Sequence, residues 1–237
     1  MGQVTTGDIQ GLAAAPAALR EALPAAGRIV RARAGQVIVS AGAASQDVYL
    51  INSGRLQVTL FAARDREIIL RDFGPGQMFG ELAAIDGRPR SASVTAAEAS
   101  VLTVIAAPAF RALVCNTPEA ALWFARQLTR HVRDMNEKVF ELSALNVRSR
   151  LHCQLLRMAA AAGVVANQAV VRPVPTHEQF AALIGTHREA VTREFGALSA
   201  MGLVNRSRSN LTIVDVDRLA AIVRALTPAG IGAGMMG

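Results

Sequence analysis

The sequence is short of lysine, aromatic residues and long apolar runs, and each shortage limits what the protein can be. Lys138 is the only lysine among 25 basic residues, so arginine carries almost all of the positive charge. Aromatic residues make up 4% of the 237 residues, which predicts a core of aliphatic side chains. The apolar runs are short and broken by charge, so we expect neither a membrane span nor a membrane partner.

Cysteine and histidine are also scarce. Cys115 and Cys153 lack the spacing of metal ligands or of a CxxC motif, and both stand among apolar residues. We therefore interpret them as small buried side chains. The four histidines are scattered, and no nucleophile has a general base at a recognisable spacing. The sequence predicts neither a metal site nor an enzyme.

Positive charge is concentrated in the last third of the chain. Residues 146–237 hold ten arginines against five acidic residues, whereas residues 1–145 are close to balanced. This excess indicates a polyanionic partner for the C-terminal region. The first eleven residues lack the basic stretch and apolar run of a signal peptide, so we expect a cytoplasmic protein.

Residues 118–145 form the longest uninterrupted helical pattern. Apolar residues recur there at alternating steps of four and three, with charged residues on the other faces. This a/d spacing predicts one long helix that pairs with a second copy of itself in a homodimer; the alternative is a helix packed on its own domain. The seam consists of Ala121, Ala125, Leu128, Val132, Met135, Val139 and Leu142.

Short β-branched segments separated by turns fill residues 28–105, which predicts a β-sandwich or barrel. Helical segments precede it, at residues 8–26, and follow it, at residues 108–114. The expected strands are residues 37–39, 48–51, 56–60, 68–70, 93–95 and 101–105.

Beyond residue 145 the pattern indicates a helix-turn-helix with a following hairpin. Asn146 can cap a helix over residues 147–162, and Thr176 with Gln179 forms a capping box. Gly185 supplies the turn between the next two helices. The alternative is an ordinary helical hairpin. The remaining elements expected are a strand at 170–172, helices at 176–184 and 187–200, and a hairpin over 203–214.

The outward face of the helix over 187–200 favours DNA reading. Arg188 and Arg193 offer donors for the guanine O6 and N7 acceptors, and Glu189 can accept from cytosine N4. The expected phosphate contacts come from the ends of the two helices and from the hairpin. They are Thr176, His177, His187, Arg206, Arg208 and Ser209.

A second informative stretch, FGELAAIDGRPRSASVTA, occupies residues 79–96. Gly80 allows close approach to a ligand, and Glu81 is a carboxylate inside an apolar run that needs a donor. Arg90 offers a fork for a phosphate, and Ser91 adds a hydroxyl. The alternative is a surface Glu–Arg pair. Backbone N–H groups could complete the cradle at Leu82, Ala83, Ser91 and Ala92.

Both stretches resemble the Crp/Fnr superfamily of bacterial transcription factors, and the resemblance extends from about Arg20 to Leu226. Residues 176–193 match T-x-x-x-[IF]-[AG]-x-x-[IVL]-G-x-x-R-E-[TA]-V-x-R, with Glu194 where many relatives have an apolar residue. The stretch from residue 79 is similar to the phosphate-binding cassette of cyclic-nucleotide-binding domains.

The resemblance implies an α+β chain with a jelly-roll-like β-roll sensor and a winged helix-turn-helix. We expect the sensor over residues 1–117 and the dimerisation helix over 118–145. The DNA-binding domain would then cover 146–226, followed by a flexible tail over 227–237.

The resemblance also implies a role for individual residues. Glu81 would bind the ribose 2′-hydroxyl, and Arg90 with Ser91 the cyclic phosphate. Arg188, Glu189 and Arg193 would read a palindrome with a TGTGA-like half-site, and RNA polymerase would be a partner. Two distant cysteines cannot supply an iron–sulfur cluster, and nothing selects His131, His152 or Cys115 as a haem ligand.

The long helix departs from the family where a purine base would touch it. The adjacent Thr and Ser of the cAMP-responsive members are replaced by Met135 and Asn136. Asn136 can donate and accept, but Met135 cannot make the same hydrogen bond. His131 stands where an Arg is common. Both cAMP and cGMP therefore remain candidate effectors, and the alternative function is a cyclic-nucleotide-binding module that regulates a protein partner without specific DNA binding.

Overall fold

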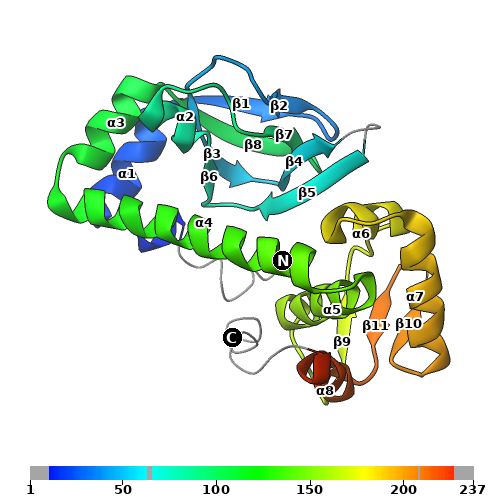
Figure 1. The fold of residues 1–237 in the computed structure, drawn as a ribbon. Coiled ribbons are helices and arrows are strands. Elements are labelled where there is room, and N and C mark those ends of the chain that lie inside the picture. Colours follow the sequence, from blue (N-terminus) through cyan, green and yellow to red (C-terminus); the bar gives the residue numbers. More distant parts are fainter. Residues whose placement is uncertain (1–10, 63–65, 208, 227–237) are drawn as a thin grey trace. The chain divides into compact units, whose positions relative to one another are not determined.

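A computed structural model describes residues 11–62, 66–207 and 209–226. The chain divides into two compact units on either side of the junction between Asn136 and Glu137, and each is described by itself. Helix α4 (Pro118–Ala144) passes from one unit into the other (Figure 1). The predicted tail from residue 227, Arg208 and the start of the predicted 8–26 helix lie outside the described residues.

The N-terminal unit contains the predicted β-roll, built from two four-stranded antiparallel sheets. The first has the order β1 (Arg28–Ala32), β8 (Ser100–Ile105), β3 (Val48–Ser53), β6 (Met78–Phe79). The second has the order β2 (Val37–Val39), β7 (Ser93–Ala96), β4 (Leu56–Ala62), β5 (Arg66–Phe73). Residues from both sheets share one core cluster, which includes Val39, Leu56, Phe79 and Leu102. The alternating apolar segments thus bury their inner faces against each other.

Helices cover one end of this β-roll. They are η1 (Leu12–Ala14), α1 (Ala17–Ala25), α2 (Glu81–Asp86) and α3 (Ala107–Cys115), together with the start of α4. A second core cluster joins them through Leu23, Phe110 and Trp123. Helices α1 and α3 were predicted from the sequence, whereas α2 was not.

The two cysteines differ in their surroundings. Cys153 is buried as predicted, with 3% of its surface exposed. The same prediction is wrong for Cys115, which is exposed at the last position of α3. Phe110 and Val114 form the buried face of that helix, so the thiol of Cys115 points away from the core.

The apolar seam of α4 is largely uncovered in the single chain. Val132 is 59% exposed, Val139 62% and Leu142 37%, whereas Leu128 and Met135 are half-buried. Leu128 thus packs against the helical core cluster of its own unit, as the alternative predicted, whereas Val132 and Val139 remain largely exposed.

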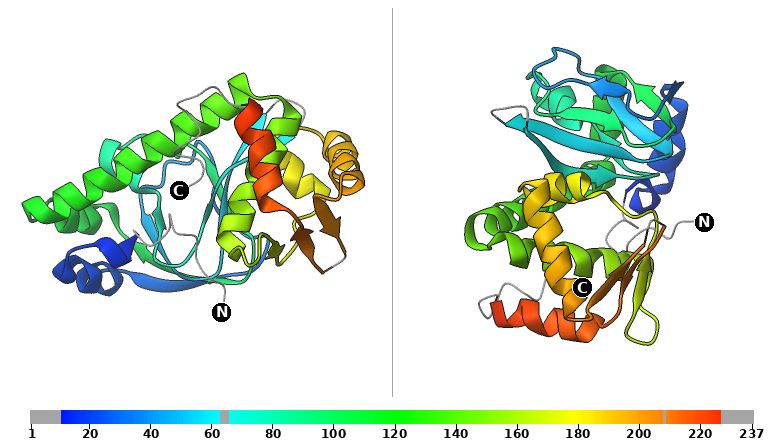
Figure 2. Two further views of the ribbon diagram at one scale, coloured as in Figure 1. Left: turned by 90° about the horizontal axis from the view of Figure 1, so that it is seen from below. Right: turned by 90° about the vertical axis from the view of Figure 1, so that its right-hand side faces the viewer.

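The C-terminal unit is a helix-turn-helix with a small antiparallel sheet. Its helices are α5 (Val147–Ala162), α6 (His177–Ile184), α7 (Arg188–Ala200) and α8 (Val216–Leu226). The sheet has the order β10 (Val204–Arg206), β11 (Leu211–Ile213), β9 (Ala169–Val171). Figures 1 and 2 show α6 and α7 crossing at a steep angle.

Local caps explain where these helices begin. The Asn146 side chain accepts from the Ser149 N–H, and Thr176 with Gln179 forms the predicted capping box. Gly185 has a φ of +65° and ends α6. The unpredicted helix α8 begins where Asp215 accepts from the Arg218 N–H. Among the described residues, no helix is long and apolar enough to cross a membrane, and no cluster of metal-ligand side chains occurs.

Candidate ligand cavity and nucleic-acid interface

Gly80 makes the turn that joins β6 to α2. Its φ is +88°, a conformation that L side chains rarely adopt. A Cβ atom at this position would lie 2.5 Å from Nη1 of Arg90 and 2.6 Å from the carbonyl oxygen of Asp47. Glycine is therefore required here, because the arginine packs directly against the turn.

Arg90 is buried, with 5% of its surface exposed, and three hydrogen bonds hold its guanidinium in place. Nε donates to Ser45 Oγ at 3.0 Å, Nη1 to the carbonyl of Gly80 at 3.0 Å, and Nη2 to that of Asp47 at 2.6 Å. A guanidinium has five N–H donors, so two remain for an anion. Burial lowers the pKa of Arg90, and nearby Tyr49, Asp47 and Glu81 oppose that shift.

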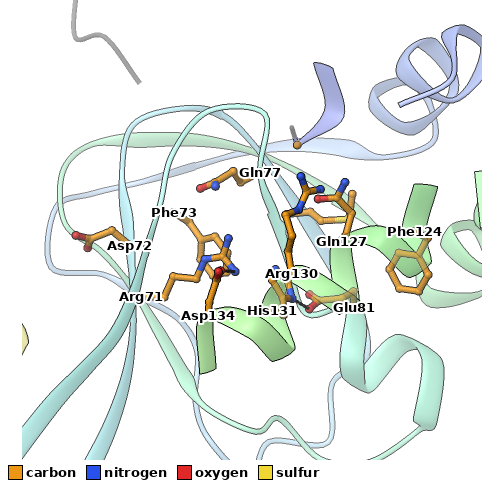
Figure 3. Close-up of a pocket in the computed structure, with 12 residues that line it drawn as sticks. Arg71, Asp72, Phe73, Gln77, Glu81, Phe124, Gln127, Arg130, His131 and Asp134 are labelled. Carbon is orange, nitrogen blue, oxygen red and sulfur yellow. Dashed lines mark ion pairs between the residues drawn. The ribbon is translucent and has the colours of Figure 1, made fainter. Parts of the chain in front are cut away.

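Glu81 opens α2 and is also buried, with 5% of its surface exposed. Its Oε1 lies 3.4 Å from Nδ1 of His131 on α4 (Figure 3). The carboxylate thus faces a ring nitrogen of the long helix and still has acceptor capacity for a hydroxyl group.

These side chains line one cavity of about 290 Å³, which we call the ligand cavity. The seven cassette residues predicted from the sequence all line it: Gly80, Glu81, Leu82, Ala83, Arg90, Ser91 and Ala92. Most of the remaining lining is apolar and comes from Val39, Val58, Leu70, Phe73, Phe79 and Val94. Met135 of α4 lines it as well, whereas Asn136 is exposed and does not.

His131, which the sequence placed near the base, also lines the cavity, and so does Arg71, which was not predicted. A β-bulge explains why alternation along β5 did not predict Arg71. Val58 pairs with Arg71 and the next residue, Thr59, pairs with Ile69, so Leu70 is an extra residue on β5. The bulge allows consecutive residues 70 and 71 to line the same cavity.

A second, more polar cavity of similar volume lies against α4 (Figure 3) and shares Arg71, Phe73, Glu81 and His131 with the first. We call it the helix-side cavity. Arg71 Nη1 lies 3.4 Å from Asp134 Oδ2 of α4 in the wall between them. Other polar residues of this cavity are Asp72, Gln77, Gln127 and Arg130.

In the C-terminal unit, Arg188, Glu189 and Arg193 are exposed on α7. Their side chains make no hydrogen bond or ion pair with the residues that the structure describes. His187, also exposed, precedes the helix without capping it through its side chain. The helix therefore presents charged groups that could contact base edges and phosphates.

Two of the predicted phosphate contacts also hold the domain together. The His177 ring stacks on Phe195, with centroids 5.2 Å apart, and its Nδ1 lies 2.8 Å from Thr192 Oγ1. Arg206 Nη2 donates to the carbonyl of Pro175 at 2.7 Å, and its guanidinium lies 5.2 Å from the Phe195 centroid. This packing role was not predicted from the sequence. Phosphate contact by His177 and Arg206 stays a prediction.

Glu194, where many relatives have an apolar residue, meets a buried histidine. Its Oε1 lies 3.0 Å from Nε2 of His152, which is fully buried on α5, and 3.0 Å from Nε of Arg148. Nδ1 of His152 is buried without a hydrogen-bond partner among the described residues. A neutral imidazole with its proton on Nε2 fits these surroundings, because it leaves only an acceptor unpaired.

His152 should therefore make stability depend on pH. Burial lowers its pKa from 6.5, although the hydrogen bond to Glu194 raises it. The unfolded chain binds the proton more readily, so the free energy of unfolding should fall as the pH drops below about 6.5. Urea unfolding of wild type and His152→Leu between pH 5 and 8 tests this, with exposed His187→Gln as the control. A slope that persists unchanged in His152→Leu would assign the effect to another group.

Two protein-family models match the chain, one within each of its two compact units. A family model described as "Cyclic nucleotide-binding domain" matches residues 29–116, and one described as "Crp-like helix-turn-helix domain" matches residues 149–222. The "Cyclic AMP receptor protein" of Thermus thermophilus is 30% identical over 192 residues, covering 81% of this chain and 86% of that protein.

Two further relatives extend the comparison. A "CRP-like cAMP-activated global transcriptional regulator" of Mycobacterium tuberculosis is 29% identical over 191 residues, with 80% of this chain and 85% of that protein covered. The solved structure of the "c-di-GMP Responsive Global Regulator CLP" of Xanthomonas campestris has a TM-score of 0.74 at 22% identity. The match covers 84% of this chain and 99% of the Xanthomonas chain. At this low identity the likeness shows a shared fold and nothing about function. The chain, with its cyclic-nucleotide-binding domain and Crp-like helix-turn-helix, belongs to the Crp/Fnr superfamily of bacterial transcription regulators.

Proposed function

We propose that the protein is a homodimeric transcription regulator controlled by a cyclic purine nucleotide, cAMP or cGMP, and that it binds a palindromic TGTGA-like site. The observation that carries the proposal is the ligand cavity, in which buried Glu81 and Arg90 accompany a largely apolar lining. This arrangement suits a ligand with an anionic, hydroxyl-bearing end and a flat, weakly polar end.

Different cassette residues would bind different groups of the nucleotide. Arg90 would donate its two remaining N–H groups to the cyclic phosphate, with Ser91 and backbone N–H groups beside it. Glu81 would accept from the ribose 2′-hydroxyl. The cAMP-activated regulator from Mycobacterium tuberculosis and the cyclic AMP receptor protein from Thermus thermophilus support a cyclic nucleotide as effector.

Dimerisation would occur along the exposed seam of α4. Val132, Val139 and Leu142 leave apolar surface that a second copy would cover. Two-fold symmetry would then present two α7 helices to successive major grooves, roughly 34 Å apart on a palindrome. RNA polymerase is the further partner expected, in the cytoplasm.

Met135 would connect ligand binding to this dimer. It belongs to the a/d seam and also lines the ligand cavity. A base bound there would contact the helix that sets the dimer geometry, so the ligand could favour one pairing of the helices over another. Asn136 lies outside the cavity of its own chain, so it would contact a base only in the cavity of the second subunit.

DNA reading is tested by Arg193→Ala, with exposed Arg224→Ala of α8 as a control for the lost charge. We expect Arg193→Ala to weaken binding to a TGTGA palindrome by about 1–3 kcal/mol and to relax preference at one base pair. Anisotropy titrations on the palindrome and its point variants, at fixed salt, measure both effects. Equal losses on palindrome and random DNA would contradict base reading.

The alternative function gives a different result in the same titrations. A module that only binds nucleotide would show no salt-sensitive duplex binding in the wild type. It would also keep its nucleotide affinity unchanged in a double variant of Arg188 and Arg193.

A further inference from the structure

Arg71 occupies the wall between the ligand cavity and the helix-side cavity. It comes from β5 rather than from the cassette, and 25% of its side chain is exposed. Its guanidinium lies 5.0 Å from the Phe73 ring centroid, and Nη1 is 3.4 Å from Asp134 Oδ2 (Figure 3). The charged head therefore lies over an aromatic ring and beside one carboxylate partner.

The base of a bound nucleotide would approach this arginine. With ribose and phosphate at Glu81 and Arg90, the base must extend toward the other lining residues, where Arg71, His131 and Met135 supply the heteroatoms. His131 already pairs with Glu81, and the Met135 thioether is only a weak acceptor. Arg71 is thus the strongest donor available to a base edge.

An arginine discriminates between the two purines because it has donors only. Guanine presents two acceptors, O6 and N7, side by side, whereas adenine presents N7 beside the N6 amino group, which is a donor. A guanidinium fork therefore matches the guanine edge with two hydrogen bonds and opposes the adenine edge at one position.

The local charges allow Arg71 to leave its present partner. Arg130 also lines the helix-side cavity and lies four residues before Asp134 on α4, on the same face. Its pKa is lowered by burial and by Arg71, and raised by Asp134, which places all three groups within electrostatic reach. Arg130 could pair with Asp134 when Arg71 turns toward the base. Because Arg71 lines both cavities, this turn requires only a change of side-chain rotamer.

We propose that Arg71 selects a 6-oxopurine cyclic nucleotide over cAMP by donating to O6 and N7, and that Arg130 takes over Asp134 when it does so. This inference rests on the proposed function, since it assumes that a cyclic nucleotide occupies the ligand cavity. It assigns ligand choice to a strand residue outside the cassette and couples that choice to an ion pair on α4.

Calorimetric titration of the full-length protein with cAMP, cGMP and cIMP tests the inference. Inosine carries the O6 and N7 acceptors of guanine without its 2-amino group, so cIMP should bind like cGMP. We expect both to bind roughly tenfold more tightly than cAMP, at the low end for a bidentate arginine–guanine pair. In Arg71→Met the three affinities should converge to within about twofold, while that for cAMP stays close to the wild-type value.

Three further variants make the result specific. Arg71→Lys keeps the charge without the fork and should also lose most of the preference for cGMP and cIMP over cAMP. This variant provides the test if Arg71→Met fails to fold. Arg55→Met should change nothing, because this half-buried arginine pairs with Asp72 and lines neither cavity. Asp134→Asn frees Arg71 and should raise cGMP affinity several-fold.

The possible failures are distinct. A wild type that binds none of the three nucleotides overturns both this inference and the proposed function. Binding of all three without preference, or an equal loss for all three in Arg71→Met, overturns only the role of Arg71. If Asp134→Asn loses cGMP affinity as Arg71→Met does, the carboxylate reads the base and the inference is wrong.

Discussion

Arg90→Met is expected to reduce affinity for a cyclic nucleotide by at least about 100-fold and to destabilise the N-terminal unit by about 3 kcal/mol. The first effect follows from losing charge-assisted bonds to the phosphate, and the second from losing three hydrogen bonds to Ser45, Gly80 and Asp47. The Gly80 turn is shaped around this guanidinium, so both effects should come from one substitution.

Calorimetry and urea unfolding measure the two effects separately. Arg88→Met is the matched control, because Arg88 is exposed two residues away and should leave both quantities near wild type. Arg90→Lys should recover part of the nucleotide affinity without the full stability, since a lysine keeps the charge but cannot reproduce the fork. An Arg90→Met variant that binds nucleotide normally would disprove the assignment of the phosphate site.

Arg157→Met is expected to destabilise the C-terminal unit by about 3–5 kcal/mol. Arg157 of α5 pairs through both terminal nitrogens with Glu141 near the end of α4, and Glu141 is only 4% exposed. Removing the arginine, whose own side chain is 37% exposed, leaves the buried carboxylate without its main partner, and an uncompensated buried charge usually has an effect of this size. Lys138 and Arg150 lie close to the carboxylate but donate to backbone carbonyls.

A double variant separates pairing from packing. Glu141→Leu combined with Arg157→Met replaces the pair with apolar side chains and should recover most of the lost stability, whereas a simple packing defect would persist. Denaturant unfolding, followed by a signal from the C-terminal unit, provides the comparison. Equal stabilities of the single and double variants would show that the Glu141 charge is not the cause.

Short-range signals explain what the sequence predicted well. Asn146 and the pair Thr176–Gln179 act through contacts three residues apart, so their caps were readable without the fold. Gly80 and Gly185 mark turns with positive φ, which the two family motifs also contain. The sequence also predicted that the cassette residues share one cavity, because they lie within thirteen consecutive positions.

The features that were missed depend on distant parts of the chain. Arg71 reaches the ligand cavity through a bulge that only strand pairing defines, and Arg206 of β10 packs on Phe195 of α7. Helix α2 is six residues long, too short for a periodic pattern. Helix α8 was different, because buried Leu219, Ala220 and Val223 follow a helical spacing that the sequence contained.

Under the proposed function, nucleotide in the N-terminal cavity controls DNA binding by α7. The most direct test is the anisotropy of a labelled TGTGA palindrome titrated with protein at fixed salt, without nucleotide and with saturating cAMP or cGMP. We predict that at least one nucleotide raises affinity for the palindrome tenfold or more, that a scrambled duplex gains far less, and that Arg90→Met abolishes the response. Affinity that stays the same up to millimolar concentrations of both nucleotides would contradict nucleotide control of DNA binding.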